Sequence, residues 1–278
     1  MQAEDASALD RGSIIHDALA ATYRRLLERF PNDPLSLANF PTAQEILGQA
    51  IHEAVDRHGG SFLALAAMRE ARERELMVLL EAYVRWEMAN NTKPRRRPIE
   101  MEMSFGMEGD GRPPVQLRHG RRTLSLRGKI DRVDAVVEPG AERYRYVVDH
   151  KTGGSALGSI RQLAPAGAVL QLALYLAALE QLMPDTTLWG GSYHIIKDRR
   201  ATAALERCSV VTAGVAELKS KTQQGADETI RNAAELALSL VDRILAGEFP
   251  ARTPGTVSCL SYCTYRDVCR EERLATWP

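Results

Sequence analysis

The chain has 278 residues, of which 45% are hydrophobic and 26% charged, and its 36 Lys and Arg balance its 36 Asp and Glu. This composition indicates one large domain, or a domain with a sizeable insertion, and excludes a fibrous or disordered protein. No run of 18 apolar residues occurs, the first residues "MQAEDASALDRG" do not form a signal peptide, and four cysteines are too few for a disulfide scaffold. We therefore expect a cytoplasmic protein without a membrane segment.

The first third of the chain has a helical pattern. Residues 10–30 place apolar side chains at helical spacing, with His16 beside the apolar stripe. Residues 42–92 predict two or three helices interrupted at His58–Gly60. We interpret residues 1–30 as an N-terminal helix and residues 31–93 as a helical insertion packed on the rest of the domain.

From Ile99 the hydrophobic period changes to two, which predicts strands in "IEMEMSF", "TLSLRGKIDRVDAVV" and "RYRYVVDHK", with a turn at "EPGAE". Residues 169–183 return to a helical pattern and "GGSYHII" predicts another strand. Residues 227–249 predict a long amphipathic helix with Gly247 near its end. This order of elements indicates an α/β fold.

Charged residues stand at the end of the strand "RYRYVVDHK". Side chains two apart in a strand share a face, so Asp149 and Lys151 point the same way and His150 points the other way. If the hairpin folds about Gly140, antiparallel partners sum to 280, and Asp131 lies opposite Asp149. Opposed carboxylates repel unless a cation lies between them, and Mg²⁺ or Mn²⁺ fits such oxygen ligands. The pattern predicts a metal-dependent hydrolytic site in which the lysine orients or deprotonates the attacking water.

The spacing Asp-x-Lys is weak when it is taken alone, since Glu217 and Lys219 repeat it within a predicted helix. Its position at a strand end, before the glycines at 153 and 154 and a helix carrying Gln171 and Tyr175 one turn apart, favours a site. In the alternative interpretation there is no site: Gln171 and Tyr175 are ordinary helix-packing residues, and His16 is a core or surface histidine. Three further histidines lie outside every motif and are assigned to packing or surface: His52, His58 and His119.

Four stretches in chain order, "RGSIIHDAL", "GKIDRVD", "VVDHKTG" and "QLALYLAAL", resemble the motifs of the PD-(D/E)xK nuclease superfamily, in the RecB/AddB-type exonuclease branch. The resemblance implies a restriction-endonuclease-like core, in which a central mixed sheet is flanked by helices. It places the catalytic sheet and the Gln-x-x-x-Tyr helix in residues 94–200, and the C-terminal helix with a cysteine triplet in residues 201–278, all within one nuclease domain.

The same resemblance implies the roles of the site residues. Lys151 is catalytic, while Gln171 and Tyr175 hold the substrate or the lysine. Glu102, in "EMSF", lines the site. The implied ligands of Mg²⁺ or Mn²⁺ are His16, Asp131, Asp149 and the backbone carbonyl of His150.

A cysteine triplet, Cys259, Cys263 and Cys269, resembles the C-terminal cysteines that hold a 4Fe-4S cluster in this branch together with one upstream cysteine. The chain departs from that pattern because the first spacing is C-x3-C and no cysteine precedes His16. Cys208 falls in a predicted strand, where a thiol is usually a buried apolar group. We expect the fourth ligand outside this chain, in a longer parent; the alternative is three reduced cysteines without a metal.

Together with the predicted metal site, the resemblance implies a metal-dependent DNA exonuclease acting on single strands or duplex ends, in recombination or repair beside a helicase. No G-x-x-x-x-G-K-[ST] loop occurs, so a motor belongs to another chain or an upstream region. Three basic runs, "NTKPRRRP", "RHGRRTLSLRGK" and "KDRR", form a phosphate surface or merely solvated loops. The competing functions are a non-catalytic DNA-binding or scaffold module of a helicase–nuclease complex and a zinc-bound interaction domain.

Overall fold

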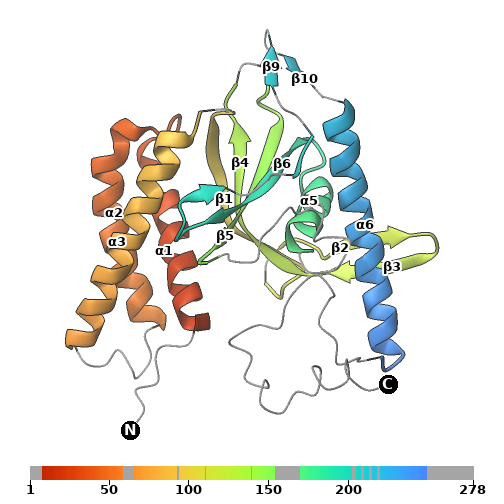
Figure 1. The fold of residues 1–278 in the computed structure, drawn as a ribbon, viewed down its shortest axis with the longest axis horizontal. Coiled ribbons are helices and arrows are strands. Elements are labelled where there is room, and N and C mark those ends of the chain that lie inside the picture. Colours follow the sequence, from red (N-terminus) through yellow and green to blue (C-terminus); the bar gives the residue numbers. More distant parts are fainter. Residues whose placement is uncertain are drawn as a thin grey trace, which may run out of the picture.

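A mixed β-sheet lies between two groups of helices (Figure 1). The computed structural model describes residues 8–58, 66–92, 94–109, 111–138, 140–153, 170–201, 205–207, 210–212, 215–217 and 220–248. Within these residues, six strands form the sheet in the order β1-β4-β5-β6-β7, and β8 also pairs with β6. The strands are β1 (Arg96–Phe105), β4 (Gly128–Val136), β5 (Tyr144–Lys151), β6 (Thr187–Ile195), β7 (Arg200–Ala201) and β8 (Leu205–Glu206). The predicted α/β fold with a central mixed sheet is confirmed.

The register between β4 and β5 follows from the turn that joins them. Arg132 pairs with Val148 and Ala135 pairs with Arg145, so antiparallel partners sum to 280, as the sequence predicts. Gly140 lies in this turn with φ of 77°, a conformation that glycine adopts without a steric penalty. The next positions along the same register are Asp131 and Asp149.

Strand β6 runs parallel to β5, which requires a crossover connection; helix α5 (Gln171–Leu182) belongs to it. The pair Gly190–Gly191 allows close packing around this strand. A Cβ at Gly190 would collide with the carbonyl oxygen of Leu205, and one at Gly191 would lie 2.9 Å from the carbonyl oxygen of Val147. The two glycines thus let β8 and β5 approach β6 closely.

Three helices form one layer beside the sheet: α1 (Ala8–Arg29), α2 (Phe40–His58) and α3 (Ala66–Asn90). They match the helices predicted on either side of His58–Gly60. Their shared core buries Tyr23, Leu47 and Leu80, and it reaches the sheet at Met101 and Ile196. No helix in the described part of the chain has the length and apolar character that crossing a membrane requires. The division into four segments, including the insertion at residues 31–93, stays a prediction.

Helices α5 and α6 (Ser220–Leu245) cover the opposite side of the sheet (Figure 1). Helix α6 begins at Ser220, well before the predicted start at residue 227. The polar stretch that precedes the amphipathic pattern is thus helical as well. Two small two-stranded sheets were not predicted as separate units. They consist of β2 (Val115–His119) with β3 (Arg122–Leu126), and β9 (Val210–Thr212) with β10 (Val215–Glu217).

A fully buried ionic cluster joins the helical layer to the sheet. Arg132 of β4 donates two hydrogen bonds to Glu87 of α3, at 2.5 and 3.1 Å, and its Nε lies 2.9 Å from Asp134. The guanidinium also lies 4.5 Å from the ring centre of Tyr23, whose hydroxyl bonds Glu87. Although burial opposes ionisation, the charge of Arg132 holds the pKa of Glu87 well below its usual range. Glu87 and Arg132 are therefore both charged, and each charge depends on the other.

We expect Glu87→Gln to destabilise the fold by about 3 kcal/mol, because it leaves the buried charge of Arg132 without its main partner on α3. Denaturant unfolding at neutral pH measures this change. Glu70→Gln on the same helix is the matched control, since Glu70 is exposed and pairs with Arg74 only at 3.6 Å; its expected cost is below about 0.5 kcal/mol. Equal costs for the two variants would contradict the role given to the cluster.

Candidate active site

The candidate active site lies where β4 begins and β5 ends, between α1 and α5 (Figure 1). Because these strands are antiparallel neighbours, the start of β4 meets the end of β5. Asp131 comes from β4, and Asp149 and Lys151 come from β5. Helix α1 contributes His16, and α5 contributes Gln171 and Tyr175. The fold thus brings together side chains separated by up to 159 residues in the sequence (175 − 16).

His16 and Asp131 form an ion pair at the centre of the site. The Nδ1 atom of His16 lies 3.2 Å from Oδ1 of Asp131, whose other oxygen accepts the backbone N–H of His150 at 2.7 Å. Burial lowers the pKa of His16, but the hydrogen bond and charge of Asp131 outweigh burial and raise it above its usual value. Burial likewise opposes ionisation of Asp131, and His16 reverses this and lowers the pKa of Asp131. The pair is held from two strands and one helix.

Asp149 carries a poorly compensated charge. Its side chain is fully buried, and Nζ of Lys151 lies 2.6 Å from Oδ2. Burial and the nearby charge of Asp131 raise the pKa of Asp149 to about 6, although Lys151 opposes this rise. The Oδ1 atom accepts no hydrogen bond from the described residues. A buried carboxylate oxygen without a donor is an acceptor available to a cation.

Glu102 adds a third carboxylate from the edge strand β1. Met101 pairs with Arg132 and Met103 with Ile130, so the same register places Glu102 opposite Asp131. Its φ of 56° is left-handed, which is uncommon for a residue other than glycine. The carboxylate lies 3.9 Å from Nδ1 of His16 and forms an ion pair with Lys129. Three neighbouring strands therefore each contribute one carboxylate to a single row across the sheet.

The donor set fits a divalent metal ion. One ligand atom from each of His16, Glu102 and Asp131 can be chosen so that all three lie within 4.8 Å of one another. Carboxylate oxygens with one imidazole nitrogen suit Mg²⁺ and, because of the nitrogen, Mn²⁺. The free oxygen of Asp149 is a further donor at the next strand. The fit therefore rests on a convergent acidic row and on one buried carboxylate oxygen, Oδ1 of Asp149, that has no hydrogen-bond donor among the described residues.

Lys151 is fixed from two sides. Its Nζ donates a hydrogen bond to Oε1 of Gln171 at 2.6 Å, and Nε2 of Gln171 donates to the hydroxyl of Tyr175 at 2.9 Å. Gln171 and Tyr175 lie one turn apart on α5, which is why both reach the same place. Burial raises the pKa of Tyr175 to about 12, so its hydroxyl stays protonated at neutral pH. The arrangement aims the ammonium group beside Asp149.

The side chain of His150 lies on the other face of the sheet, as strand alternation predicts. It packs parallel to the ring of Tyr23 at 6.2 Å and edge-on to Tyr83 at 5.8 Å. Burial lowers its pKa to about 3, so the imidazole is neutral. Its predicted role as a ligand concerns its backbone carbonyl, and that role stays a prediction.

The remaining residues that the sequence singles out are four cysteines and the histidines outside the motifs. Cys259, Cys263 and Cys269 fall outside the described residues, as does Cys208. His52 and His58 of α2 contact the carboxylates of Glu73 and Asp17, at 3.0 and 2.7 Å.

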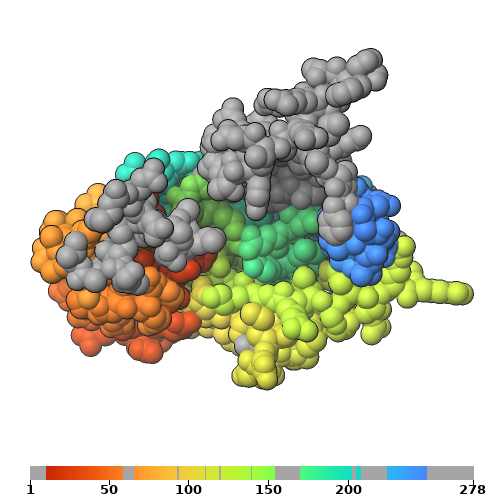
Figure 2. All heavy atoms as spheres, turned by 90° about the horizontal axis from the view of Figure 1, so that it is seen from below, coloured from red at the N-terminus to blue at the C-terminus, as the bar shows by residue number. Residues whose placement is uncertain are grey.

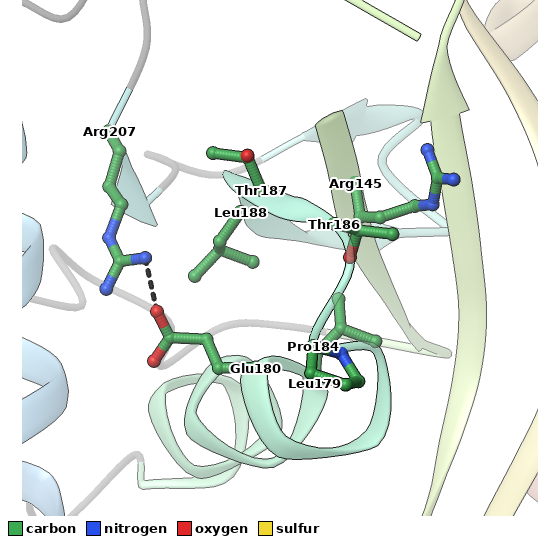
Figure 3. Close-up of a pocket in the computed structure, with 8 residues that line it drawn as sticks. All are labelled: Arg145, Leu179, Glu180, Pro184, Thr186, Thr187, Leu188 and Arg207. Atoms are coloured by element: carbon green, nitrogen blue, oxygen red, sulfur yellow. Dashed lines mark hydrogen bonds and ion pairs between the residues drawn. The ribbon is translucent and has the colours of Figure 1, made fainter. Parts of the chain in front are cut away.

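The pocket in Figure 3 is separate from the candidate active site. It has a volume of about 250 Å³ and lies at the far ends of β5 and β6, near Arg145 and Thr187. An ion pair between Arg207 and Glu180 crosses one side of it (Figure 3). The pocket therefore shares no residue with the acidic row.

We expect Asp149→Asn to stabilise the metal-free protein at pH 7 by about 2 kcal/mol. The folded protein holds a proton on Asp149 up to about pH 6, against an ordinary pKa of 3.8, so this group lowers stability as pH rises between about 4 and 6. Asp149→Asn cannot ionise at this position, so its stability does not fall over this pH range for this reason. Thermal or urea unfolding in EDTA at pH 4.5 and 7 measures the stability difference between the variant and the wild type. Asp185→Asn is the control, since Asp185 is exposed. A stability difference that does not grow with pH would contradict the repulsion between Asp131 and Asp149.

Comparison with known proteins identifies the family. A sequence model described as the PD-(D/E)XK nuclease superfamily matches residues 2–270. Relatives named as a subunit of an ATP-dependent helicase/deoxyribonuclease include that of Symbiobacterium thermophilum, 41% identical over 107 residues, which are 36% of this chain and 9% of the relative. That of Limosilactobacillus fermentum is 27% identical over 205 residues, 66% of this chain and 16% of the relative. The chain thus spans less than a fifth of these relatives. Because the superfamily match covers nearly all of its residues, the chain belongs to the PD-(D/E)XK nuclease superfamily.

Proposed function

We propose that this protein is a Mg²⁺- or Mn²⁺-dependent deoxyribonuclease, an exonuclease that hydrolyses phosphodiester bonds in single-stranded DNA or at duplex ends. The observation that carries the proposal is the row of Glu102, Asp131 and Asp149, beside which Asp149 and Gln171 hold Lys151. The superfamily match supports a nuclease, and the names of the relatives support DNA as the substrate. We further propose that the nuclease acts in DNA recombination or repair, beside a helicase.

When bound, a divalent metal would supply Lewis acidity toward the scissile phosphate and a more acidic water as nucleophile. His16, Glu102, Asp131 and Asp149 are the residues that would hold it. Lys151 orients the attacking water and stabilises the negative charge that develops on the phosphoryl oxygens. Gln171 accepts a hydrogen bond from Lys151 and limits where its ammonium group can point, and Tyr175 fixes the amide of Gln171 in turn.

We expect Lys151→Ala to reduce cleavage of end-labelled DNA by at least about 100-fold, because it removes a positive charge that acts mainly in the transition state. Nucleotide release in Mg²⁺ is the measurement, with DNA affinity measured in parallel and expected to change little. Lys219→Ala is the matched control, since Lys219 follows Glu217 at the same spacing in the sequence. Wild-type-like cleavage by Lys151→Ala would refute the assignment.

The same assay separates the nuclease from the competing function of a non-catalytic DNA-binding or scaffold module. A module of that kind would bind DNA and release no nucleotides with either Mg²⁺ or Mn²⁺. The presence of Asp131, Asp149 and Lys151, with the lysine held by Gln171, favours the enzyme, since a site without catalytic work has no need of a buried, repelling pair of carboxylates.

We expect His16→Ala to shift the metal dependence of cleavage, raising the half-saturating Mn²⁺ concentration by about tenfold or more, because it removes the nitrogen donor. The half-saturating concentration should rise by a larger factor for Mn²⁺ than for Mg²⁺. His52→Ala provides the control, since His52 pairs with Glu73 on the exposed side of α2. Superimposable metal titrations of His16→Ala and the wild type would place His16 in the packing and remove it from the metal site.

Three finer features belong to this proposal. The cysteine triplet would hold an iron–sulfur cluster whose fourth ligand lies outside this chain. A separate helicase chain, or a helicase region of a longer chain, would deliver the DNA, as the names of the relatives suggest. The cytoplasm is the expected compartment. None of these features is needed for the hydrolysis itself.

A further inference from the structure

The stretch from the start of β2 to the start of β4 carries an unusual concentration of positive charge. Residues 115–129 contain no Asp or Glu, whereas they contain five cationic side chains: Arg118, Arg121, Arg122, Arg127 and Lys129. A run of one charge can be a solvated surface, so composition does not settle its use. The structure shows which of these cations already have partners.

The β2–β3 hairpin has two chemically different faces. One face presents Val115, Leu117, Leu124 and Leu126, which pack against the core shared by α5 and α6. The register pairs Gln116 with Ser125 and Arg118 with Thr123 on the opposite face, where Gln116 donates a hydrogen bond to the hydroxyl of Ser125 at 2.8 Å. The second face is therefore composed of hydrogen-bonding groups, and it is open to solvent.

Arg122 belongs to the packed face. It forms an ion pair with Asp242 of α6 at 2.6 Å, and this contact helps to dock the hairpin. Lys129 is paired with Glu102 at the candidate active site. All five cations are exposed, but Arg118, Arg121 and Arg127 form no ion pair within the described residues. Three of the five cations are thus available to an anion from outside the chain.

The hairpin leads directly into the candidate active site. Strand β3 ends at Leu126, and β4 begins at Gly128 and carries Asp131 three residues later. A Cβ at Gly128 would lie 3.5 Å from the ring of Tyr175, so this junction borders the site. Figure 1 shows the hairpin leaving the lower end of β4 and passing behind α6, and Figure 2 shows it as a protrusion from the body.

We propose that the β2–β3 hairpin, with Arg118 on its open face, Arg121 in its turn and Arg127 just after β3, is a guide for the DNA backbone that leads substrate to the acidic row. The partner is DNA, recognised through its phosphates and without base specificity, because guanidinium groups pair well with phosphate oxygens and phosphate contacts carry no sequence information. This inference rests on the proposed function for the identity of the polyanion.

The dimensions of the hairpin agree with this use. From residue 121 to residue 127 a strand extends about 20 Å at roughly 3.3 Å per residue, and one strand of a duplex presents about six phosphates over that length. Arg121 and Arg127 lie at the two ends of this path and Arg118 pairs with Thr123 beside it, so each of the three can neutralise one phosphate. Every such contact releases counterions and adds about 0.9 to the salt dependence of log affinity for duplex DNA, or about 0.7 for single strands.

The test compares DNA binding by the wild type and by the triple variant R118Q/R121Q/R127Q in EDTA, where no metal is available for cleavage. Fluorescence anisotropy is recorded with labelled single-stranded and duplex DNA between about 50 and 200 mM salt. We expect the slope of log affinity against log salt to fall by about 2 to 3, and affinity at about 100 mM salt to fall at least tenfold. Loss of slope on only one DNA form supports the guide and identifies the form it takes.

The matched control is Arg122→Gln, which removes the same charge from the same hairpin on its packed face. Its slope should match that of the wild type, and circular dichroism and the unfolding temperature should show that all variants fold. An unchanged slope for the triple variant, or an equal change for Arg122→Gln, would overturn the proposal. Because binding is measured without cleavage, a wild type that fails to cut DNA but shows the slope difference contradicts the proposed nuclease function and leaves the guide in place.

Discussion

The buried ion pairs of Arg132 are the interaction on which the rest of the structure depends. Strand alternation turns Arg132 toward Glu87 in the helical layer and turns the preceding residue, Asp131, toward the site. One strand therefore connects the two halves of the molecule through two adjacent residues. Because the guanidinium has no exposure to water, its position is determined by its partners, and the position of Asp131 follows from it.

Much of the fold and part of the site can be predicted from local sequence patterns. The short hairpin between β4 and β5 fixes its own register, so the opposition of Asp131 and Asp149 follows from the position of Gly140. The helical spacing of Gln171 and Tyr175 likewise ensures that the two side chains meet. These predictions succeed because few residues separate the interacting parts.

Other features depend on contacts that the sequence does not encode locally. Glu102 lies opposite Asp131, but more than twenty residues and a separate hairpin intervene, so their register cannot be counted from a turn. Glu87 stands in a helix as one acidic residue among several, and only the packing of α3 shows that it is buried against Arg132. The left-handed backbone of Glu102 is a further departure from what a strand pattern predicts.

The alternation of β5 also protects the chain against a misfolded sheet. If β5 paired with its neighbours one position out of step, Asp149 and Lys151 would enter the layer that Tyr23 and Tyr83 occupy around His150. Two charges would then lose their partners in a buried layer whose charged groups already pair with one another, whereas the neutral imidazole would take their place beside Gln171. The residues that make the site reactive thus also make the slipped sheet unstable, so the chemistry of the site contributes to the fidelity of folding.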